Sequence, residues 1–242
     1  MSPVLETRGL CKAFGSQQVL AGVDLAVEKG ESLVVIGQSG TGKSVLLKCI
    51  LGLETPDAGQ VLWQGKPLDR RTRAAFLDGF GMLFQGAALF DSMTVWQNVA
   101  FRLRRRLGDA KARRIAVEKL ARVGLGAEVA DLHPAALSGG MAKRAGLARA
   151  IAADPQVIFF DEPTTGLDPI RAARINALIC DIVTETGATA ITITHDMTTV
   201  RRVADRVAML SGGGVVWQGD VAGMEAACEP HLHDFIRGIW RP

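Results

Sequence analysis

A glycine-rich segment between two apolar runs constrains the fold of this chain more than any other feature. The segment spans residues 37–44 and reads Gly-Gln-Ser-Gly-Thr-Gly-Lys-Ser, between the apolar runs Leu33–Ile36 and Val45–Leu47. Strand, tight turn and helix in that order are the context of a phosphate-binding loop, and an ordinary glycine-rich turn is the alternative. Glycines let successive backbone N–H groups face a polyphosphate, and the helix start adds a positive dipole end. Lys43 is expected to reach the β- and γ-phosphates, and the Ser44 hydroxyl to bind Mg²⁺.

Composition excludes several classes of protein. The 242 residues suffice for one domain or for one core with an inserted subdomain. A net charge of +3 suits an anionic ligand or a position near a membrane and does not indicate nucleic acid. The four cysteines have no metal-ligand spacing, so we expect them to be reduced and mostly buried. The chain opens without a signal peptide and has no apolar run near the roughly 20 residues of a membrane span, so we expect any membrane role to come through a partner.

The order of elements predicts an α/β core interrupted by helices. Residues 4–27 alternate short apolar segments with turn residues, which predicts β-strands. Three helical stretches without an intervening strand are expected at residues 94–107, 109–123 and 139–152, with Thr94 and Asp109 as N-caps. Strand and helix then alternate again. We therefore predict a core of residues 1–86 and 153–242 and a helical subdomain of residues 87–152.

Two carboxylates follow the apolar strand Val157–Phe160. Ligands of parallel sheets bind at the carboxyl ends of strands, where Asp161 and Glu162 would lie. Asp161 would hold Mg²⁺ through water, and Glu162 would polarise the water that attacks the γ-phosphate. A solvated acidic turn is the alternative.

A second glycine pair opens a helix at Leu137-Ser138-Gly139-Gly140-Met141, here called the signature segment. Its free backbone N–H groups suit an anion, which suggests a site shared between two subunits. Gln85 follows a strand, Thr165–Asp168 follows the carboxylates, and His195 stands near the end of the chain. Taken alone, Gln85 would be a solvated residue, His195 a neighbour of a helix cap, and Phe14 a packed hairpin residue.

Together and in this order, these motifs resemble those of the ABC-type ATPases over nearly the whole chain. The resemblance implies a P-loop NTPase (RecA-like) core with an N-terminal antiparallel β-subdomain and an inserted α-helical subdomain. It also implies a head-to-tail homodimer that encloses two ATP molecules, with Phe14 stacked on adenine. The implied ATP contacts are Phe14, Gly37, Gln38, Ser39, Gly40, Thr41, Gly42, Lys43, Ser44, Val45, Ser138, Gly139, Gly140 and Asp168. The implied Mg²⁺ contacts are Ser44, Gln85 and Asp161, and the implied catalytic residues are Glu162, Gln85 and His195.

Two segments indicate a particular subfamily of the ABC-type ATPases. The commonest importer signature continues with glutamines, whereas this chain continues with Met141-Ala142-Lys143-Arg144. This stretch and residues 81–95 look like the ATPase subunit of Mla-type phospholipid transporters. That resemblance implies work at the cytoplasmic face of the inner membrane of a Gram-negative cell, with a polytopic permease and an MCE-domain protein and without nucleic acid. An ATPase for another substrate, such as an amino acid or a drug, is the alternative, and a non-transport ABC protein is a more distant one.

Three further segments carry expectations of their own. Residues 87–93 form an adaptable apolar patch that suits a partner's helix, or else the core of the helical insert. Arg102–Arg106 would be either a solvated helix face or a contact to anionic lipid. Residues 234–242 place Phe235, Ile236, Ile239 and Trp240 on one face of a short helix, which we expect to dock on a subunit, and a frayed end is the alternative.

Overall fold

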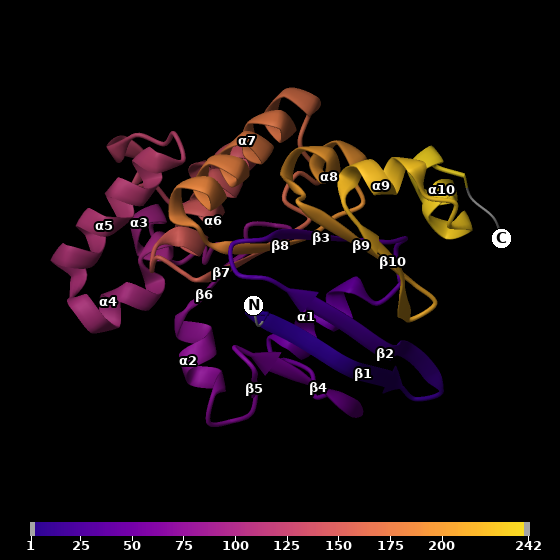
Figure 1. The fold of residues 1–242 in the computed structure, drawn as a ribbon. Coiled ribbons are helices and arrows are strands. Elements are labelled where there is room, and N and C mark those ends of the chain that lie inside the picture. Colours follow the sequence, from indigo (N-terminus) through magenta and orange to yellow (C-terminus); the bar gives the residue numbers. More distant parts are fainter. Residues whose placement is uncertain (1–2, 240–242) are drawn as a thin grey trace. The chain divides into compact units, whose positions relative to one another are not determined.

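The structure, a computed structural model, describes residues 3–239, which fold as two compact units (Figure 1). Unit 1 contains the described residues up to Leu77 and from Thr189 onward, and unit 2 contains residues 78–188. Within the described range, no helix is long and apolar enough to span a membrane. The predicted boundaries of the helical subdomain, at residues 87 and 152, stay a prediction.

Unit 1 contains an antiparallel sheet and a group of mostly parallel strands. The antiparallel sheet has the order β2-β1-β4-β5. In the other group, β3 lies between β8 and β9 and runs parallel to both, while β10 pairs antiparallel with β9. All five residues of β3 are buried, as its continuous apolar run predicts. The strands are β1 (Leu5–Phe14), β2 (Gln17–Val27), β3 (Ser32–Ile36), β4 (Ala58–Trp63), β5 (Lys66–Pro67), β8 (Thr189–Ile193), β9 (Arg206–Ser211) and β10 (Gly214–Gly219).

The helices of unit 1 follow the predicted order, but the last one is displaced. They are α1 (Lys43–Ile50), α2 (Arg73–Asp78), whose last residue belongs to unit 2, α8 (Met197–Val203), α9 (Val221–Ala226) and α10 (Pro230–Arg237). Helix α10 ends at Gly238, which adopts the left-handed conformation at φ 64°. The predicted helix over residues 234–242 is therefore wrong in its extent, because Ile239 lies beyond the cap and is exposed. Trp240 lies outside the described residues.

Unit 2 combines two parallel strands with a group of helices. Its strands β6 (Phe80–Leu83) and β7 (Val157–Asp161) pair in register from Phe80 with Val157 to Leu83 with Phe160. Figure 1 shows α3, α4 and α5 gathered together, and both α3 and α5 pack against α6. The helical elements are α3 (Val95–Val99), α4 (Phe101–Leu107), α5 (Asp109–Arg122), the 3₁₀ turns η1 (Ala127–Val129) and η2 (Pro134–Ala136), α6 (Gly139–Ile151) and α7 (Pro169–Thr186).

Three local expectations need correction. The stretch 94–107 is two helices, because the backbone leaves the helical region at Ala100 (φ −89°, ψ 12°), and both α3 and α4 then pack against α5. Thr94 is an N-cap as predicted, but Asp109 is the first residue of α5 and pairs with Arg104 instead. The cysteines are free but not mostly buried, since only Cys49 is buried, Cys11 and Cys180 are half-buried and Cys228 is exposed.

Candidate functional site

The predicted site residues divide between the two units. In unit 1, the phosphate loop (residues 37–44) connects β3 to α1. Gly42 precedes α1 in the left-handed conformation (φ 99°), and the first turn of α1 has no side-chain cap. A Cβ on Gly42 would lie 2.9 Å from the carbonyl oxygen of Val19, so the position requires glycine. The uncapped N–H groups fit an anion at this helix start.

Lys43 adds a positive charge to the same loop. Its side chain folds back over the loop, and Nζ donates to the carbonyl oxygens of Gly37 (2.6 Å) and Gln38 (2.8 Å). The residue is buried, whereas Ser44 is exposed in the first turn of α1. An ammonium group, uncapped backbone N–H groups and an exposed hydroxyl are the donor set that a polyphosphate with Mg²⁺ requires. The residues present therefore fit both a polyphosphate and an Mg²⁺ ion.

Strand pairing brings His195 to the phosphate loop's end of unit 1. Strands β3 and β8 are parallel, with Val35 opposite Ile193, and the Thr194 N–H donates to Val35 O at 3.3 Å. The loops after the two strands thus leave the same edge, and His195 is exposed there. Asp196 caps α8 by accepting from the Thr198 N–H at 2.9 Å. His195 is therefore the neighbour of a helix cap, as the alternative states, and its contact to phosphate stays a prediction.

Phe14 stands at the end of β1, in the hairpin that approaches the phosphate loop. Phe14 is 47% exposed, so the hairpin covers only part of its side chain. Lys12 places its ammonium 5.3 Å from the ring centroid. The returning strand β2 carries Val19, whose carbonyl faces Gly42. An exposed ring in this hairpin suits a flat aromatic ligand group.

In unit 2, Gln85 and the carboxylates Asp161 and Glu162 lie at the carboxyl ends of two neighbouring parallel strands. Strands β6 and β7 are parallel. Gln85 lies shortly after the end of β6, Asp161 is the last residue of β7, and Glu162 follows it. Glu162 adopts φ 47°, a conformation that side-chain-bearing residues rarely take. Its Oε2 accepts from the Thr165 hydroxyl at 3.1 Å. Backbone strain of this kind is typical of functional sites.

A buried lysine from the signature helix α6 lies between these motifs. Lys143 Nζ donates to the carbonyl oxygens of Gln85 and, at 3.2 Å, of Glu162. Burial lowers the pKa of the Lys143 ammonium, and the charges of Asp161 and Glu162 act in the opposite direction. The sequence interpretation did not single out Lys143 as a site residue, although its place in a signature that commonly carries glutamine was a signal.

The signature segment and Asp168 both form helix starts. Ser138 caps α6, its Oγ accepting from the Met141 N–H at 3.3 Å, and Gly139 is exposed beside it. Asp168 caps α7, and its Oδ1 accepts from the Arg171 N–H at 3.0 Å. These backbone hydrogen bonds, first of all the one from Arg171, lower the pKa of Asp168. Ser138 and Gly139 are exposed, so the start of α6 lies at the surface of unit 2.

Known proteins with this pattern define the family. The model of the ABC transporter family matches residues 20–165. A "Probable ribonucleotide transport ATP-binding protein mkl" of Mycobacterium bovis is 40% identical over 98% of this chain and 67% of its own length. A "Methionine import ATP-binding protein MetN" of Caulobacter vibrioides is 46% identical over 86% of this chain and 64% of its own length.

Solved structures agree with this assignment. The structure of cbiO1 from Clostridium perfringens, part of the ABC transporter complex cbiONQ, has a TM-score of 0.84 at 29% identity, covering 98% of this chain and 96% of that one. The dimeric, post-hydrolysis structure of the ATP-binding cassette MJ0796 with ADP and Pi has a TM-score of 0.80 at 28% identity, covering 90% and 98%. The predicted P-loop NTPase fold, with its antiparallel sheet and helical part, is confirmed. The chain belongs to the ABC transporter family, as an ATP-binding subunit that hydrolyses ATP with Mg²⁺.

Proposed function

We propose that this ATPase powers phospholipid movement across a Gram-negative envelope, as a peripheral subunit at the cytoplasmic face of the inner membrane. Its partners would be a polytopic permease and an MCE-domain lipid-binding protein. The observation that carries the proposal is the pair of segments at residues 81–95 and 141–150, which look like those of Mla-type transporters. Both segments lie in unit 2. Residues 81–95 form the end of β6, the loop after it and the first residue of α3, and residues 141–150 lie within α6.

The chemistry is assigned to residues of both units. Lys43 and the uncapped start of α1 would hold the phosphates. Ser44, Asp161 and Gln85 would hold Mg²⁺, which would neutralise charge on the phosphate oxygens. Glu162 takes the proton of the attacking water, and the strained backbone at this residue sets the direction of its carboxylate. His195 contacts the γ-phosphate, and Phe14 stacks on the adenine.

A head-to-tail homodimer completes each site in this proposal. Ser138, Gly139 and Gly140 of one subunit would close on the γ-phosphate held by the other, with Asp168 alongside. The exposure of the signature segment on unit 2 supports this arrangement, as does the dimer described for the MJ0796 cassette. A site divided in this way makes hydrolysis depend on dimer formation.

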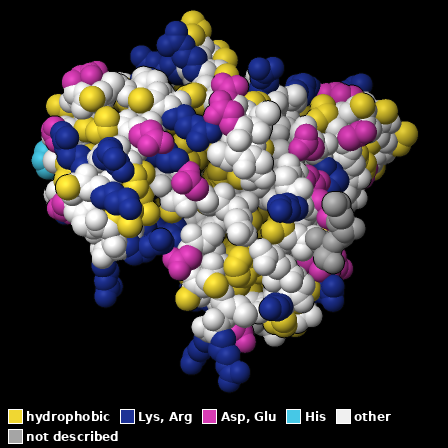
Figure 2. Space-filling model, turned by 60° about the vertical axis from the view of Figure 1, so that its left-hand side comes forward, with side chains coloured by type: hydrophobic (Ala, Val, Ile, Leu, Met, Phe, Trp, Pro, Cys, Tyr) yellow, Lys and Arg dark blue, Asp and Glu magenta, His cyan; other side chains and the backbone are white. Residues whose placement is uncertain are grey.

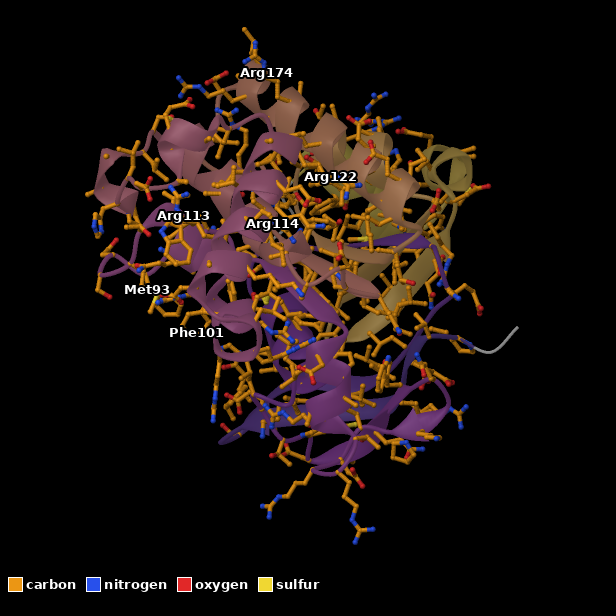
Figure 3. All side chains as sticks on the ribbon, turned by 90° about the vertical axis from the view of Figure 1, so that its left-hand side faces the viewer. Met93, Phe101, Arg113, Arg114, Arg122 and Arg174 are labelled. Carbon is orange, nitrogen blue, oxygen red and sulfur yellow. The ribbon has the colours of Figure 1, made fainter. Side chains whose placement is uncertain are left out.

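An apolar groove in unit 2 is the proposed docking site for the permease. The groove has a volume of about 240 Å³. Phe84, Phe90 and Phe101 line it with rings that are 39%, 45% and 44% exposed, and the centroids of Phe90 and Phe101 lie 4.9 Å apart. Hydrophobic side chains lie among Lys and Arg side chains over this face in Figure 2, and Phe101 and Met93 are marked in Figure 3. Exposed aromatic rings in a groove suit an amphipathic helix from a permease subunit.

The arginines beside this groove are partly engaged within the unit. Arg102 donates to Phe80 O at 2.6 Å and pairs with Asp78, and Arg104 pairs with Asp109. Arg104 also lies over the ring of Trp96, at 5.2 Å from its centroid. These contacts favour a structural role for Arg102 and Arg104 over a contact to lipid headgroups.

Phe101→Asp should release the ATPase from its permease. A carboxylate in the groove would have to be desolvated when the partner's apolar helix docks, which costs several kcal/mol or forces the complex apart. Co-expressed, tagged permease should retain at least about tenfold less of the variant than of the wild type. Leu132→Asp, at an exposed leucine outside the groove, is the matched control and should be retained. Equal retention of both variants would exclude the groove as the docking site.

Methionine import is a second candidate function. The MetN relatives, at 41% and 46% identity, support it as directly as the mkl relatives support ribonucleotide transport. The ATP site does not distinguish phospholipid, methionine and ribonucleotide transport, because it binds ATP and not the transported substrate. The substrate therefore depends on the membrane partners.

A reconstituted complex distinguishes these functions. The chain is assembled in vesicles with the permease and the substrate-binding protein of its own operon, and transfer of a fluorescent phospholipid is followed with and without ATP. We expect ATP-dependent lipid transfer that Glu162→Gln abolishes, and no stimulation of the ATPase by methionine or ribonucleotides. Stimulation by methionine without lipid transfer would establish the second candidate instead.

A further inference from the structure

Two cations on the signature helix α6 hold the loop after β6. Lys143 donates to Gln85 O, and Arg149 donates to Ala87 O and Ala88 O, both at 2.6 Å. Both side chains come from one helix and reach residues 85–88, a four-residue part of the loop between β6 and α3. Every one of these bonds ends on a backbone carbonyl, so the pair fixes the path of the loop regardless of its side chains.

The loop they hold is strained. Ala87 and Ala88 adopt φ values of 61° and 48°, and neither is a glycine. A left-handed residue with a Cβ is unfavourable and persists only where its surroundings determine it. The planar Arg149 guanidinium, which donates through both terminal nitrogens, supplies that determination.

Helix α6 packs directly against the end of β6 and against the loop that follows it. Gly146 lies between the two cations on α6, and a Cβ there would approach Leu83 Cδ1 to 2.9 Å and Ala87 Cβ to 3.1 Å. The helix therefore touches both the end of β6 and the loop itself. A shift of α6 must move these backbone atoms with it, because a packed interior transmits displacement.

Lys143 also extends the connection to the second strand. The same ammonium that bonds Gln85 O bonds Glu162 O at 3.2 Å, and Glu162 is itself left-handed. Lys143 is only 6% exposed, and its lowered pKa has burial as its main cause. A buried cation is retained where it satisfies groups that would otherwise be unpaired.

We propose that Lys143 and Arg149 form a latch, by which the signature helix sets the backbone positions of Gln85 and Glu162 for hydrolysis. Both are positioning residues, because neither reaches the reacting atoms. The proposal rests on the hydrolytic roles proposed above for Gln85 and Glu162. Closure of a partner subunit on Ser138, at the start of α6, would reach the catalytic carboxylate through this latch. Arg149 also lines the docking groove, 5.7 Å from the Phe84 ring centroid, so a docked permease helix would act on the same loop.

The test compares two buried lysines of unit 2. Lys143→Met removes the donors to both carbonyls, whereas Lys119→Met removes a buried lysine whose partner, Asp154 at 2.6 Å, lies away from the site motifs. For Lys143→Met we expect kcat for MgATP to fall by about tenfold or more, since a small misplacement of catalytic groups is costly. We expect its KM to stay within about twofold, because the phosphate loop is unaltered. Lys119→Met should lower the melting temperature but keep kcat within about twofold.

Two further variants keep the test independent of folding. Lys143→Gln retains two N–H donors, so its kcat should exceed that of Lys143→Met. Arg149→Lys retains the charge but cannot donate in a planar fork, so its kcat should fall with KM unchanged. Wild-type kcat in Lys143→Met, an equal loss of kcat in Lys119→Met, or no recovery in Lys143→Gln would overturn the latch.

Different experimental results would contradict the proposed catalytic base and the proposed latch. If Glu162→Gln turns over ATP as the wild type does, the assignment of the base is wrong whatever Lys143 does. If Glu162→Gln is inactive while Lys143→Met and Arg149→Lys keep the wild-type kcat, the base is right and the latch alone is wrong.

Discussion

Replacing Glu162 by glutamine is expected to lower ATP turnover by about 10²–10⁴-fold while ATP binding is kept. The amide preserves the shape of the side chain but cannot accept the proton of the attacking water. The phosphate loop and Lys43 belong to unit 1 and are unaltered, so the nucleotide is still held. Because ATP would be bound but not hydrolysed, the variant should accumulate as the closed dimer.

Sizing chromatography with MgATP and a phosphate-release assay check both parts of this prediction. The variant should elute as a dimer in MgATP and as a monomer in ADP. Thr165→Val is a useful companion, because it removes the 3.1 Å hydrogen bond to Glu162 Oε2 and leaves the carboxylate in place. It should lose far less turnover than Glu162→Gln. Turnover of Glu162→Gln within a few-fold of the wild type would exclude this residue as the base.

Much of the fold could be predicted because its strongest signals are local. The apolar runs before residue 37 and before Asp161 are the buried strands β3 and β7. Parallel pairing then places the loops after neighbouring strands at a common edge of the sheet. For this reason Gln85 lies at the same edge as Glu162, and His195 lies at the same edge as the phosphate loop. Motif order and strand direction together suffice for that part of the site.

The latch could not be predicted, because it depends on contacts between distant segments. Nothing in the sequence near Ala87 and Ala88 indicates a left-handed backbone, and Arg149, which binds the carbonyl oxygens of both, lies more than 60 residues away. The departure of the signature from glutamine marks Lys143, but only the structure shows that its ammonium lies between two carbonyl oxygens. Tertiary packing overrides local preference in both cases.

The remaining errors have the same origin at a smaller scale. The bend at Ala100 allows both α3 and α4 to pack against α5. The sequence does not indicate this bend, because no glycine or proline stands at it. Helix α10 begins earlier than expected because Glu229 caps it, accepting from the Leu232 N–H at 2.6 Å, and Gly238 ends it. The apolar periodicity of residues 235–240 favours a later helix, but the cap residues decide where the helix begins and ends.

Mixing Ser138→Arg with Lys43→Ala subunits should restore hydrolysis that neither variant has alone. Lys43→Ala removes the charge-assisted contact to phosphate within its own subunit. Ser138→Arg places a bulky cation at the start of α6, where the partner subunit's nucleotide would be enclosed. In a head-to-tail dimer of the two variants, one site carries both defects and the other carries neither. Each mixed dimer should therefore regain up to about half of the wild-type activity if the sites act independently.

The mixing ratio makes this prediction quantitative. At fixed total protein, activity should be maximal at equal amounts of the two variants and should vanish at either end, because only mixed dimers contain an intact site. Mixtures of Lys43→Ala with the double variant Lys43→Ala/Ser138→Arg supply the control, since no pairing of those chains creates an intact phosphate loop. A flat, inactive profile would contradict either the sharing of sites between subunits or their independence. Mixed dimers of the wild type with Lys43→Ala separate these outcomes, because they keep one intact site whether or not the sites are shared and are inactive only if that site cannot act without its neighbour.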